Sequence, residues 1–343
     1  MVSIPQSMHE HWDSALKHFR DPVRRSWILL NPTSIGDTYI TCAFAKAFRA
    51  THGGLITMVV KEEQRLIPEM FPGDIDRIVV WDADELHQLC NRIQRMCTFS
   101  VDNPIIAHPY WHGDGRLGEF LSLSALGGGR GILFTDMFRH ILRVSWDTEL
   151  ATPCVPEKWQ REALSLCMEC GVVPGESVVL FPENNSVSAF PEEIWERIGA
   201  ALVKAGKTVF TNCYGSSKGH RAYPVAGTRS IIVPLHLATP IVNLAGRAIG
   251  GANGLVATMV AHPRTANITN LIYASESQAF RLNGMITRHP VAMQSIVNTG
   301  VGTERLTEFV VDPDHCDDAL IQQIVANRES DWAKSDASIR LRR

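Results

Sequence analysis

Short apolar runs rich in β-branched residues alternate with stretches of helical periodicity along most of this 343-residue chain. The runs have the length of buried strands and are bounded by turn residues, whereas the stretches between them repeat their apolar positions every three or four residues. Strands that alternate with helices indicate a parallel sheet with helices packed on its faces. The sequence therefore predicts an α/β protein with doubly wound, Rossmann-like sheets.

The alternation begins twice along the chain. In the first half we expect strands over 27–31, 55–60, 77–81 and 104–108, and helices over 38–50, 61–70 and 84–96. Two prolines in "ATPCVPEKW" (151–159) then interrupt the pattern, which restarts after a helix that ends near Cys170. In the second half we expect strands over 177–181, 208–211, 230–233, 247–250 and 267–273, helices over 191–204, 240–246 and 255–262, and a closing helix within 312–335. The sequence thus predicts two tandem domains, 1–155 and 156–325, followed by a C-terminal helix and tail over 326–343.

Composition argues against several classes of protein. Hydrophobic residues make up 45% of the chain, which suits packed cores, and the formal net charge of -3 with no basic block does not suit a nucleic-acid partner. No apolar run is long enough for a transmembrane segment, and residues 1–19 have the pattern of an amphipathic helix with acidic residues rather than of a signal peptide. We therefore expect a soluble, cytoplasmic protein.

The eight cysteines are scattered along the chain, which favours reduced thiols over a disulfide framework. Only Cys167 and Cys170, in "LCMEC", lie one helical turn apart. A zinc site needs two more ligands, and no nearby pair supplies them at the usual spacing. We expect ordinary core or surface thiols and no metal site.

Two doubly wound units in tandem imply a cleft between them, because open parallel sheets bind ligands beyond the carboxyl ends of their strands. The stretch "TSIGDTYITCAFAKAF" (33–48) follows the apolar run "SWILLNP" directly, so it lies at such an end. Gly36 allows a ligand to approach the backbone, and the helix start favours an anion. Asp37 either stabilises the helix dipole or acts as a general base that takes a proton from an acceptor hydroxyl.

A polar loop follows the first expected strand of the second half, in "VVLFPENNSVSAFPEEIWER" (178–197). Asn184, Asn185 and Ser186 in this loop either bind a phosphate or form a solvated turn. The loop ends in a helix start marked by proline and two glutamates. Its position predicts that it lies at the mouth of the cleft.

A glycine-rich turn follows a later strand, in "LAGRAIGGANGLVATMVAH" (244–262). Gly251 ends the expected strand, and Asn253 and Gly254 open a helix of small residues. Backbone donors and the helix dipole at such a start suit a diphosphate, although glycines that pack a helix tightly on a sheet give the same pattern.

Basic residues near these stretches are candidate partners of a phosphate. Lys218 and Arg221 belong to "NCYGSSKGHR" (212–221), which follows a strand, and His220 and Arg247 are further candidates. Each either pairs with a phosphate or is simply solvated.

Aromatic and polar residues gather after the last strand of the first half, in "AHPYWHGDGRLGEF" (107–120). The candidate residues are His108, Tyr110, Trp111, His112 and Asp114, with Arg116 beside them. Aromatic faces beside hydrogen-bonding groups suit a sugar or another polar ring. An acceptor wall, ordinary loop packing and a metal site held by the two histidines are all open from the residues alone.

In this order and at these separations, the stretches resemble the family 9 glycosyltransferases, typified by the lipopolysaccharide heptosyltransferases of the GT-B fold. Members carry an "IGD" turn after the first strand. They also carry a strand, a polar loop and a "P-E-x-W" helix at the start of the second domain, and an "aG-x-x-x-x-D-S/T-G" turn near the donor. The resemblance spans about residues 26–274, and the first two motifs match best.

The resemblance implies an inverting glycosyl transfer from a nucleotide-sugar co-substrate, without metal or other cofactor. The aspartate of the "IGD" turn is the base in the family, so that role falls on Asp37, with Gly36 in the acceptor-side turn. The first domain then holds the acceptor, which is a saccharide, a lipid-linked glycan or a small molecule. The second domain binds the nucleoside-diphosphate sugar.

The chain departs from the family pattern on the donor side. Ser188 stands where the family places a lysine that contacts the donor phosphate, and Ala252 replaces an acidic residue, with Asn253 next to it; the family's histidine becomes Ala257 or a neighbour. Either the donor has changed, or another cation substitutes, or activity has been lost. The alternatives to a transferase are a nucleotide-sugar epimerase or hydrolase on the same fold and a catalytically degenerate GT-B-like binding protein.

Overall fold

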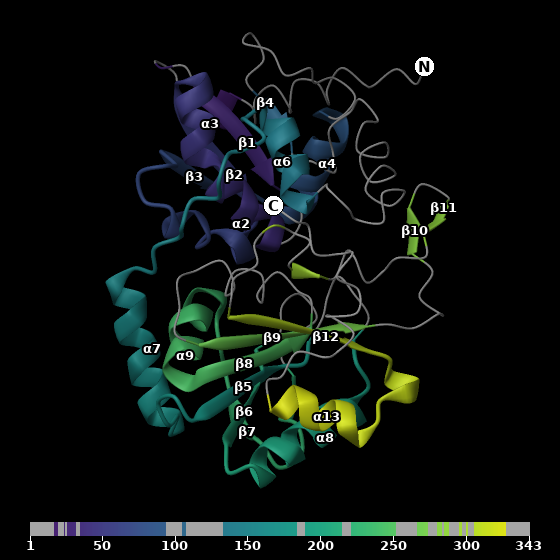
Figure 1. The fold of residues 1–343 in the computed structure, drawn as a ribbon. Helices are drawn as coiled ribbons and strands as arrows, with labels where there is room; N and C mark the ends of the chain where they lie inside the picture. The colour runs from purple at the N-terminus through teal and green to yellow at the C-terminus, as the bar shows by residue number, and fades with distance from the viewer. Residues whose placement is uncertain are drawn as a thin grey trace. The chain divides into compact units, whose positions relative to one another are not determined.

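The chain divides into two compact units (Figure 1). The computed structural model describes residues 17–19, 24, 26–31, 35–93, 105–107, 133–183, 189–214, 221–251, 266–273, 280–282, 285–287, 295–296, 300 and 305–326. The first unit comprises Met1–Phe120 and Asp136–Ala151, and the second comprises Leu121–Thr135 and Thr152–Arg343. Each unit is built around its own parallel sheet.

The sheet of the first unit has four parallel strands in the order β3-β2-β1-β4. The strands are β1 (Ser26–Asn31), β2 (Leu55–Val60), β3 (Arg77–Val80) and β4 (Ile105–Ala107). β2 and β3 therefore lie in order on one side of β1, and β4 lies on its other side. All four strands lie where the sequence predicts them, within two residues at each end.

Successive side chains of β1 point to opposite faces of this sheet, and helices pack on both faces. Ile28 and Leu30 share a buried cluster with Leu86 and Leu89 of helix α4 (Ala83–Ile93), whereas Trp27 packs edge-on against Phe48 of helix α3 at a centroid distance of 5.2 Å. Further helices of the unit are α2 (Ile35–Ala43), α3 (Ala45–His52) and α6 (Phe134–Leu142), of which α6 lies partly in the second unit by its first two residues. The sheet is thus buried on both faces, as a parallel sheet requires.

The helices of the first unit differ from the prediction in three places, of which the first is α6, a helix that was not predicted. The helix expected over 38–50 is two helices, because the chain breaks at Phe44 between α2 and α3. The helix expected over 61–70 is wrong: the segment forms two short 3₁₀ turns, η1 (Glu62–Gln64) and η2 (Pro68–Met70). Pro68 explains this, since proline cannot donate the backbone hydrogen bond that a continuous helix needs.

The sheet of the second unit has six parallel strands in the order β12-β9-β8-β5-β6-β7. The strands are β5 (Ser177–Phe181), β6 (Thr208–Asn212), β7 (Arg229–Ile231), β8 (Gly246–Gly251), β9 (Asn267–Tyr273) and β12 (Leu306–Val311). Numbered within the unit, this order is 3-2-1-4-5-6 read from β7, the order of the dinucleotide-binding fold. Strand β12 is not among the predicted strands.

Helices cover both faces of the second sheet (Figure 1). On one face, α8 (Glu192–Lys204) and α13 (Asp318–Val325) bury a cluster that includes Trp195, Ile321 and Phe309 of β12. On the other face, α9 (Ala238–Ala245) packs against β5 and β8, with α7 (Glu157–Cys170) behind it. Short elements complete the described part: η4 (Leu235–Leu237), η5 (Pro313–His315) and an antiparallel pair, β10 (Phe280–Leu282) and β11 (Met285–Thr287).

Two further helix predictions of the second half have different outcomes. The helix expected over 255–262 lies outside them. The closing helix expected within 312–335 is α13, whose start is capped by the Asp317 carboxylate, which accepts from the backbone N–H of Leu320 at 2.8 Å. In the part of the chain that the structure describes, no helix combines the length and apolar character needed to cross a bilayer.

Candidate functional site

In each sheet the strand order reverses at one position: strands added later in the chain lie on the other side of the first strand. In the first unit this switch point lies between β1 and β4, where Leu30 pairs with Ala107. In the second unit it lies between β5 and β8, where Phe181 pairs with Gly250. Open α/β sheets bind ligands outside the carboxyl ends of the strands at such points, because the two connections leave in opposite directions and open a crevice. The segments after β1, β4, β5 and β8 are therefore the places to look for a site.

Asp37 lies at the switch point of the first sheet. It is the third residue of α2, which begins at Ile35 shortly after the last residue of β1, Asn31. Only 7% of Asp37 is exposed, and Gly36 beside it is partly buried. Asp37 thus lies in the first turn of α2, at the positive end of the helix dipole.

Two buried polar residues fix the turn that carries Asp37. The Thr41 hydroxyl donates to the backbone carbonyl of Asp37 at 2.9 Å and accepts from the Asn31 side-chain amide at 3.2 Å. Asn31 and Thr41 are buried, at 0% and 6% exposure. The end of β1 is thus tied to the first turn of α2 through side chains. Sequence reasoning missed both residues, although a polar residue that ends an otherwise apolar strand is a signal that could have pointed to Asn31.

The aromatic segment of the sequence follows β4. β4 ends at Ala107, and it pairs directly with β1. The candidate residues His108, Tyr110, Trp111, His112 and Asp114, and Arg116 with them, lie outside the described residues. Their role as an acceptor wall stays a prediction.

Most of the donor-side candidates follow, in sequence, the two strands at the switch point of the second sheet. β5 ends at Phe181 and β8 ends at Gly251, which is buried. The candidates Asn184, Asn185, Ser186, Ser188, Asn253 and Gly254 follow these two strands and lie outside the described residues, as does Lys218. The topology therefore brings both donor-side segments to one edge of the sheet, and their contacts with a donor stay predictions.

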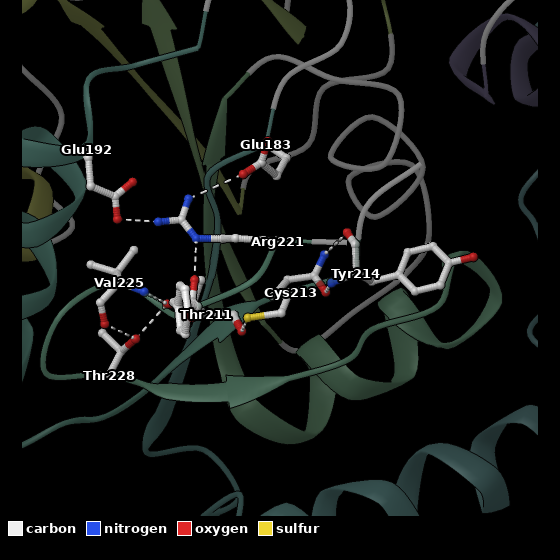
Figure 2. A network of polar contacts seen from close by, with 10 residues as sticks. Glu183, Glu192, Thr211, Cys213, Tyr214, Arg221, Val225 and Thr228 are labelled. Carbon is white, nitrogen blue, oxygen red and sulfur yellow. Dashed lines mark hydrogen bonds and ion pairs between the residues drawn. The ribbon is translucent and has the colours of Figure 1, made fainter. Parts of the chain in front are cut away.

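Arg221 is the donor-side cation that the structure describes, and it is engaged by two carboxylates (Figure 2). Its Nη1 donates to Glu183 Oε1 at 3.3 Å, its Nη2 donates to Glu192 Oε1, and its Nε donates to the Tyr223 carbonyl at 2.7 Å. Burial lowers the pKa of Arg221, but the hydrogen bonds and charges of Glu192 and Glu183 outweigh burial and raise that pKa overall. The guanidinium is therefore charged and shared between two acids.

The chain around Arg221 is fastened to β6. The backbone N–H of Arg221 donates to the Cys213 carbonyl at 3.1 Å, directly after the end of β6. Farther along, the Thr211 hydroxyl of β6 accepts from the Val225 N–H at 3.1 Å and lies 2.6 Å from the Thr228 hydroxyl. Figure 2 shows these contacts side by side. The segment that carries Arg221 is thus anchored to the sheet on both sides of the guanidinium.

Arg247 is the candidate that the structure removes from the donor side. It is the second residue of β8, so it lies at the amino end of the strand, away from the carboxyl edge. Its guanidinium donates to the carbonyls of Val325, at 2.6 Å, and Ile324 at the end of α13, and to the Thr269 hydroxyl at 3.2 Å. Burial lowers the pKa of Arg247 to about 10, so the side chain is still a cation at neutral pH. Its role is to satisfy the last carbonyls of α13.

The thiols and the acidic and histidine side chains form no metal-binding group of three among the described residues. Seven cysteines in the described part of the chain are free thiols. Burial raises the pKa of Cys167 to about 11, and the charge of Cys170 adds to this, so Cys167 is a neutral core thiol at physiological pH.

No protein-family model matches the chain, and no curated protein matches it in sequence. Solved structures do match. A family 9 glycosyltransferase from Veillonella parvula is similar over 92% of this chain and 97% of its own, with a TM-score of 0.54 and 13% sequence identity. An ADP-heptose LPS heptosyltransferase II from E. coli is similar over 88% of this chain and 96% of its own, with a TM-score of 0.52 and 11% identity.

At such low identity the likeness shows the fold alone. That fold is the two-sheet, Rossmann-like architecture of GT-B glycosyltransferases, so the predicted fold class is confirmed. The resemblance to family 9 that the motifs indicate is confirmed at this level, over nearly the whole length of both solved proteins.

Proposed function

We propose that this chain is an inverting, metal-independent glycosyltransferase that moves a sugar from a nucleoside-diphosphate sugar to an acceptor hydroxyl. One observation supports this most: Asp37 of the "IGD" sequence lies in the first turn of α2, at the switch point of the first sheet. The fold supports the same conclusion, since it matches the fold of a family 9 glycosyltransferase. The acceptor is a saccharide, a lipid-linked glycan or a small molecule.

In the proposed reaction Asp37 is the general base. Its carboxylate takes the proton of the acceptor hydroxyl as the hydroxyl oxygen forms a bond to the anomeric carbon of the donor. The bond from that carbon to the diphosphate oxygen breaks on the opposite face, and its electron pair leaves with the nucleoside diphosphate. A single displacement of this kind inverts the anomeric configuration. Gly36 and the segment 108–114 then belong to the acceptor side.

The departing diphosphate needs donors that stabilise its charge. Backbone N–H groups after β5 and β8, with the side chains of 184–188 and of Asn253, supply these in the proposed enzyme. No metal is required for this, and the corresponding test is that a chelator leaves turnover unchanged. The donor is a nucleoside-diphosphate sugar whose base and sugar are open, because Ser188 and Ala252 replace the lysine and the acid of the resembled family.

Asp37→Asn tests the proposal. We expect kcat to fall by about 10²–10⁴-fold, the usual contribution of a positioned base, while the dissociation constant of the nucleoside diphosphate stays unchanged. Product release is measured with a panel of nucleotide-sugars and acceptors, and binding is measured by calorimetry.

Asp84→Asn is the matched control for Asp37→Asn. Asp84 is also an acidic residue in the first turn of a helix that follows a strand of the same sheet, but it is exposed and lies after the edge strand β3. Its replacement should leave turnover unchanged. Turnover that survives in Asp37→Asn, or that falls equally in both variants, removes Asp37 from the mechanism.

One observation favours a second candidate, a binding protein with a degenerate cleft. The described cation on the donor side, Arg221, is shared between Glu183 and Glu192, and Ser188 replaces the family's lysine. Thermal-shift measurements against nucleoside diphosphates separate the candidates, since a protein that responds to none of them does not use a nucleotide-sugar. Among proteins that respond, product analysis separates a transferase from an epimerase or hydrolase, which needs no acceptor.

A further inference from the structure

Both ends of the connection between β5 and α8 meet on one guanidinium. Glu183 is the second residue after β5, and Glu192 is the first residue of α8. Arg221, which belongs to the next connection along the chain, pairs with both carboxylates (Figure 2). The end of β5 and the start of α8 are therefore joined through one side chain that comes from the segment after β6.

The shape of the arginine side chain allows this double contact. Its planar fork presents Nη1, Nη2 and Nε in fixed directions, and here the three nitrogens donate to three different residues: Glu183, Glu192 and the Tyr223 carbonyl. A lysine ammonium is a compact charge on a flexible stem and does not reproduce such a fork. The geometry therefore depends on arginine rather than on a positive charge alone.

The guanidinium is held firmly from its own side as well. The Arg221 side chain has 16% exposure, against 50% for Glu183 and 48% for Glu192. Its backbone is bonded to Cys213 at the end of β6, and Nε is bonded to Tyr223. The more fixed member of the cluster is thus the cation, and it lies between the two more exposed acids.

Charge argues against a phosphate on Arg221. Two carboxylates already share the single positive charge, so an anion that approached would have to displace at least one of them and would meet the other. Like charges that share a site disfavour each other strongly. The sequence alone makes Arg221 a candidate phosphate ligand, and the structure gives its donors to other groups.

We propose that Arg221 is a positioning residue: it holds the start of α8 to the end of β5, at the donor-side edge of the second sheet, without contacting the donor phosphate itself. This inference rests on the proposed function for its effect on a donor. The clasp itself, defined as Arg221 with Glu183 and Glu192, exists in the free protein and can be tested without any ligand.

Hydrogen exchange of the intact free protein tests the clasp directly. In Arg221→Ala we expect amides between 183 and 192 to exchange about tenfold faster than in the wild type, because local opening no longer breaks the ion pairs. Glu183→Gln and Glu192→Gln should each give a smaller change, since each leaves one carboxylate in place. Exchange over 183–192 that is unchanged in Arg221→Ala overturns the proposal.

Arg197→Ala is the matched control. Arg197 also joins two elements of the second unit through a carboxylate and a carbonyl: it donates to Asp318 Oδ1 at 2.8 Å and to the Cys316 carbonyl at 2.7 Å. It connects α8 with the start of α13 and makes neither contact of the clasp. Its loss should leave exchange over 183–192 at the wild-type rate, and an equal increase in both variants would mean that α8 loosens as a whole, which also overturns the proposal.

Titration with nucleoside diphosphates separates a positioning residue from a phosphate ligand. We expect Arg221→Ala to raise the dissociation constant and the donor KM by about tenfold, with kcat at saturating donor nearly unchanged, because the start of α8 is then no longer held to the end of β5 before binding. Arg221→Lys should bind no better than Arg221→Ala, since an ammonium does not reproduce the fork. Rescue of binding by lysine, with exchange over 183–192 still fast, would identify Arg221 as a phosphate ligand and overturn the inference.

The two levels of the proposal fail in different ways. If the wild-type protein binds none of the nucleoside diphosphates, the proposed function fails, and the part of the inference that concerns a donor fails with it. The clasp is then still decided by the exchange experiment, because that measurement needs no ligand.

Discussion

Gly246→Ala is the substitution whose effect follows most directly from the structure. Gly246 opens β8 with a φ of +102°, in the left-handed region that side chains rarely adopt. A Cβ at this position would lie 2.9 Å from the Cα and the carbonyl oxygen of Gly175 and 3.0 Å from its carbonyl carbon. All three are backbone atoms, so no flexible side chain can move aside. Strand β8 can begin this close to the Gly175 backbone only because residue 246 has no side chain.

The magnitude has two unfavourable terms and one favourable term. The left-handed conformation costs an alanine about 1–2 kcal/mol. Overlap with a rigid neighbour, as in an overpacked core, costs about 1–3 kcal/mol. Alanine also lowers the conformational entropy of the unfolded chain, and this stabilises the folded state by about 0.4–1 kcal/mol. We expect Gly246→Ala to lower the free energy of unfolding of the second unit by about 1–5 kcal/mol in total.

Gly206→Ala isolates the conformational term. Gly206 follows α8 with a φ of +78°, and no atom lies within 4 Å of the position that its Cβ would occupy. Its replacement should therefore lower the free energy of unfolding by only about 1 kcal/mol. The difference between the two variants measures the contact with Gly175.

Urea unfolding of the intact chain, followed by circular dichroism, gives both values. Because the chain has two units, the transitions are fitted separately and each variant is assigned by the hydrogen exchange of β8 amides. A Gly246→Ala variant no less stable than Gly206→Ala would refute the reasoning, since the approach of the two backbones would then have no energetic consequence.

Thr41→Val removes the hydroxyl that donates to the Asp37 carbonyl and accepts from Asn31, and we expect the free energy of unfolding to fall by about 1–3 kcal/mol. Thr41→Ser keeps the hydroxyl and should retain most of the stability in the same urea experiment; equal losses would contradict the assignment. The hydrogen bond to Asp312, and then its charge, raise the pKa of His315 above 6.5. This pairing favours the folded state while His315 is protonated and is lost as pH rises through the raised pKa, so NMR titration should show the shift, and it should vanish in Asp312→Asn but largely persist in Asp314→Asn.

The sequence predicts best those strands and helices whose residues locally favour only one type of secondary structure. β2, β5 and β9 begin and end at the predicted residues, because most residues of each run are apolar or β-branched and buried. β12 was missed for the opposite reason. Its sequence "LTEFVV" places Glu308 in the middle of the strand, and only the structure shows where that carboxylate is used.

Glu308 illustrates why distant partners decide such a case. Its carboxylate accepts from the Asn270 side-chain amide at 2.7 Å and from the Ser295 hydroxyl and Ile296 N–H, both at 2.6 Å. A charged residue in an edge strand is tolerated when its oxygens are satisfied in this way. Because Asn270 is 38 residues away in the chain, no local pattern could indicate the pair.

The same distinction holds for the candidate site. The position of Asp37 at a strand-to-helix junction is local information, and the structure agrees with it. The partners of Arg221 are 29 and 38 residues away, so the sequence left open whether this side chain meets a phosphate or an acid. Strand order was equally hidden, since the return of the chain to place β4 beside β1 and β8 beside β5 requires long-range pairing.

Charge at the second switch point indicates which of its two sides suits a diphosphate in the proposed enzyme. A helix start normally attracts anions, but α8 begins with Glu192 and Glu193, so two carboxylates already occupy the positive end of its dipole. The nearby cation, Arg221, is neutralised by Glu183 and Glu192. The end of β8 differs, because it offers Gly250 and Gly251, whose backbone has no side chain and no charge to keep an anion away. In the proposed enzyme we therefore expect the diphosphate on the β8 side rather than at the start of α8.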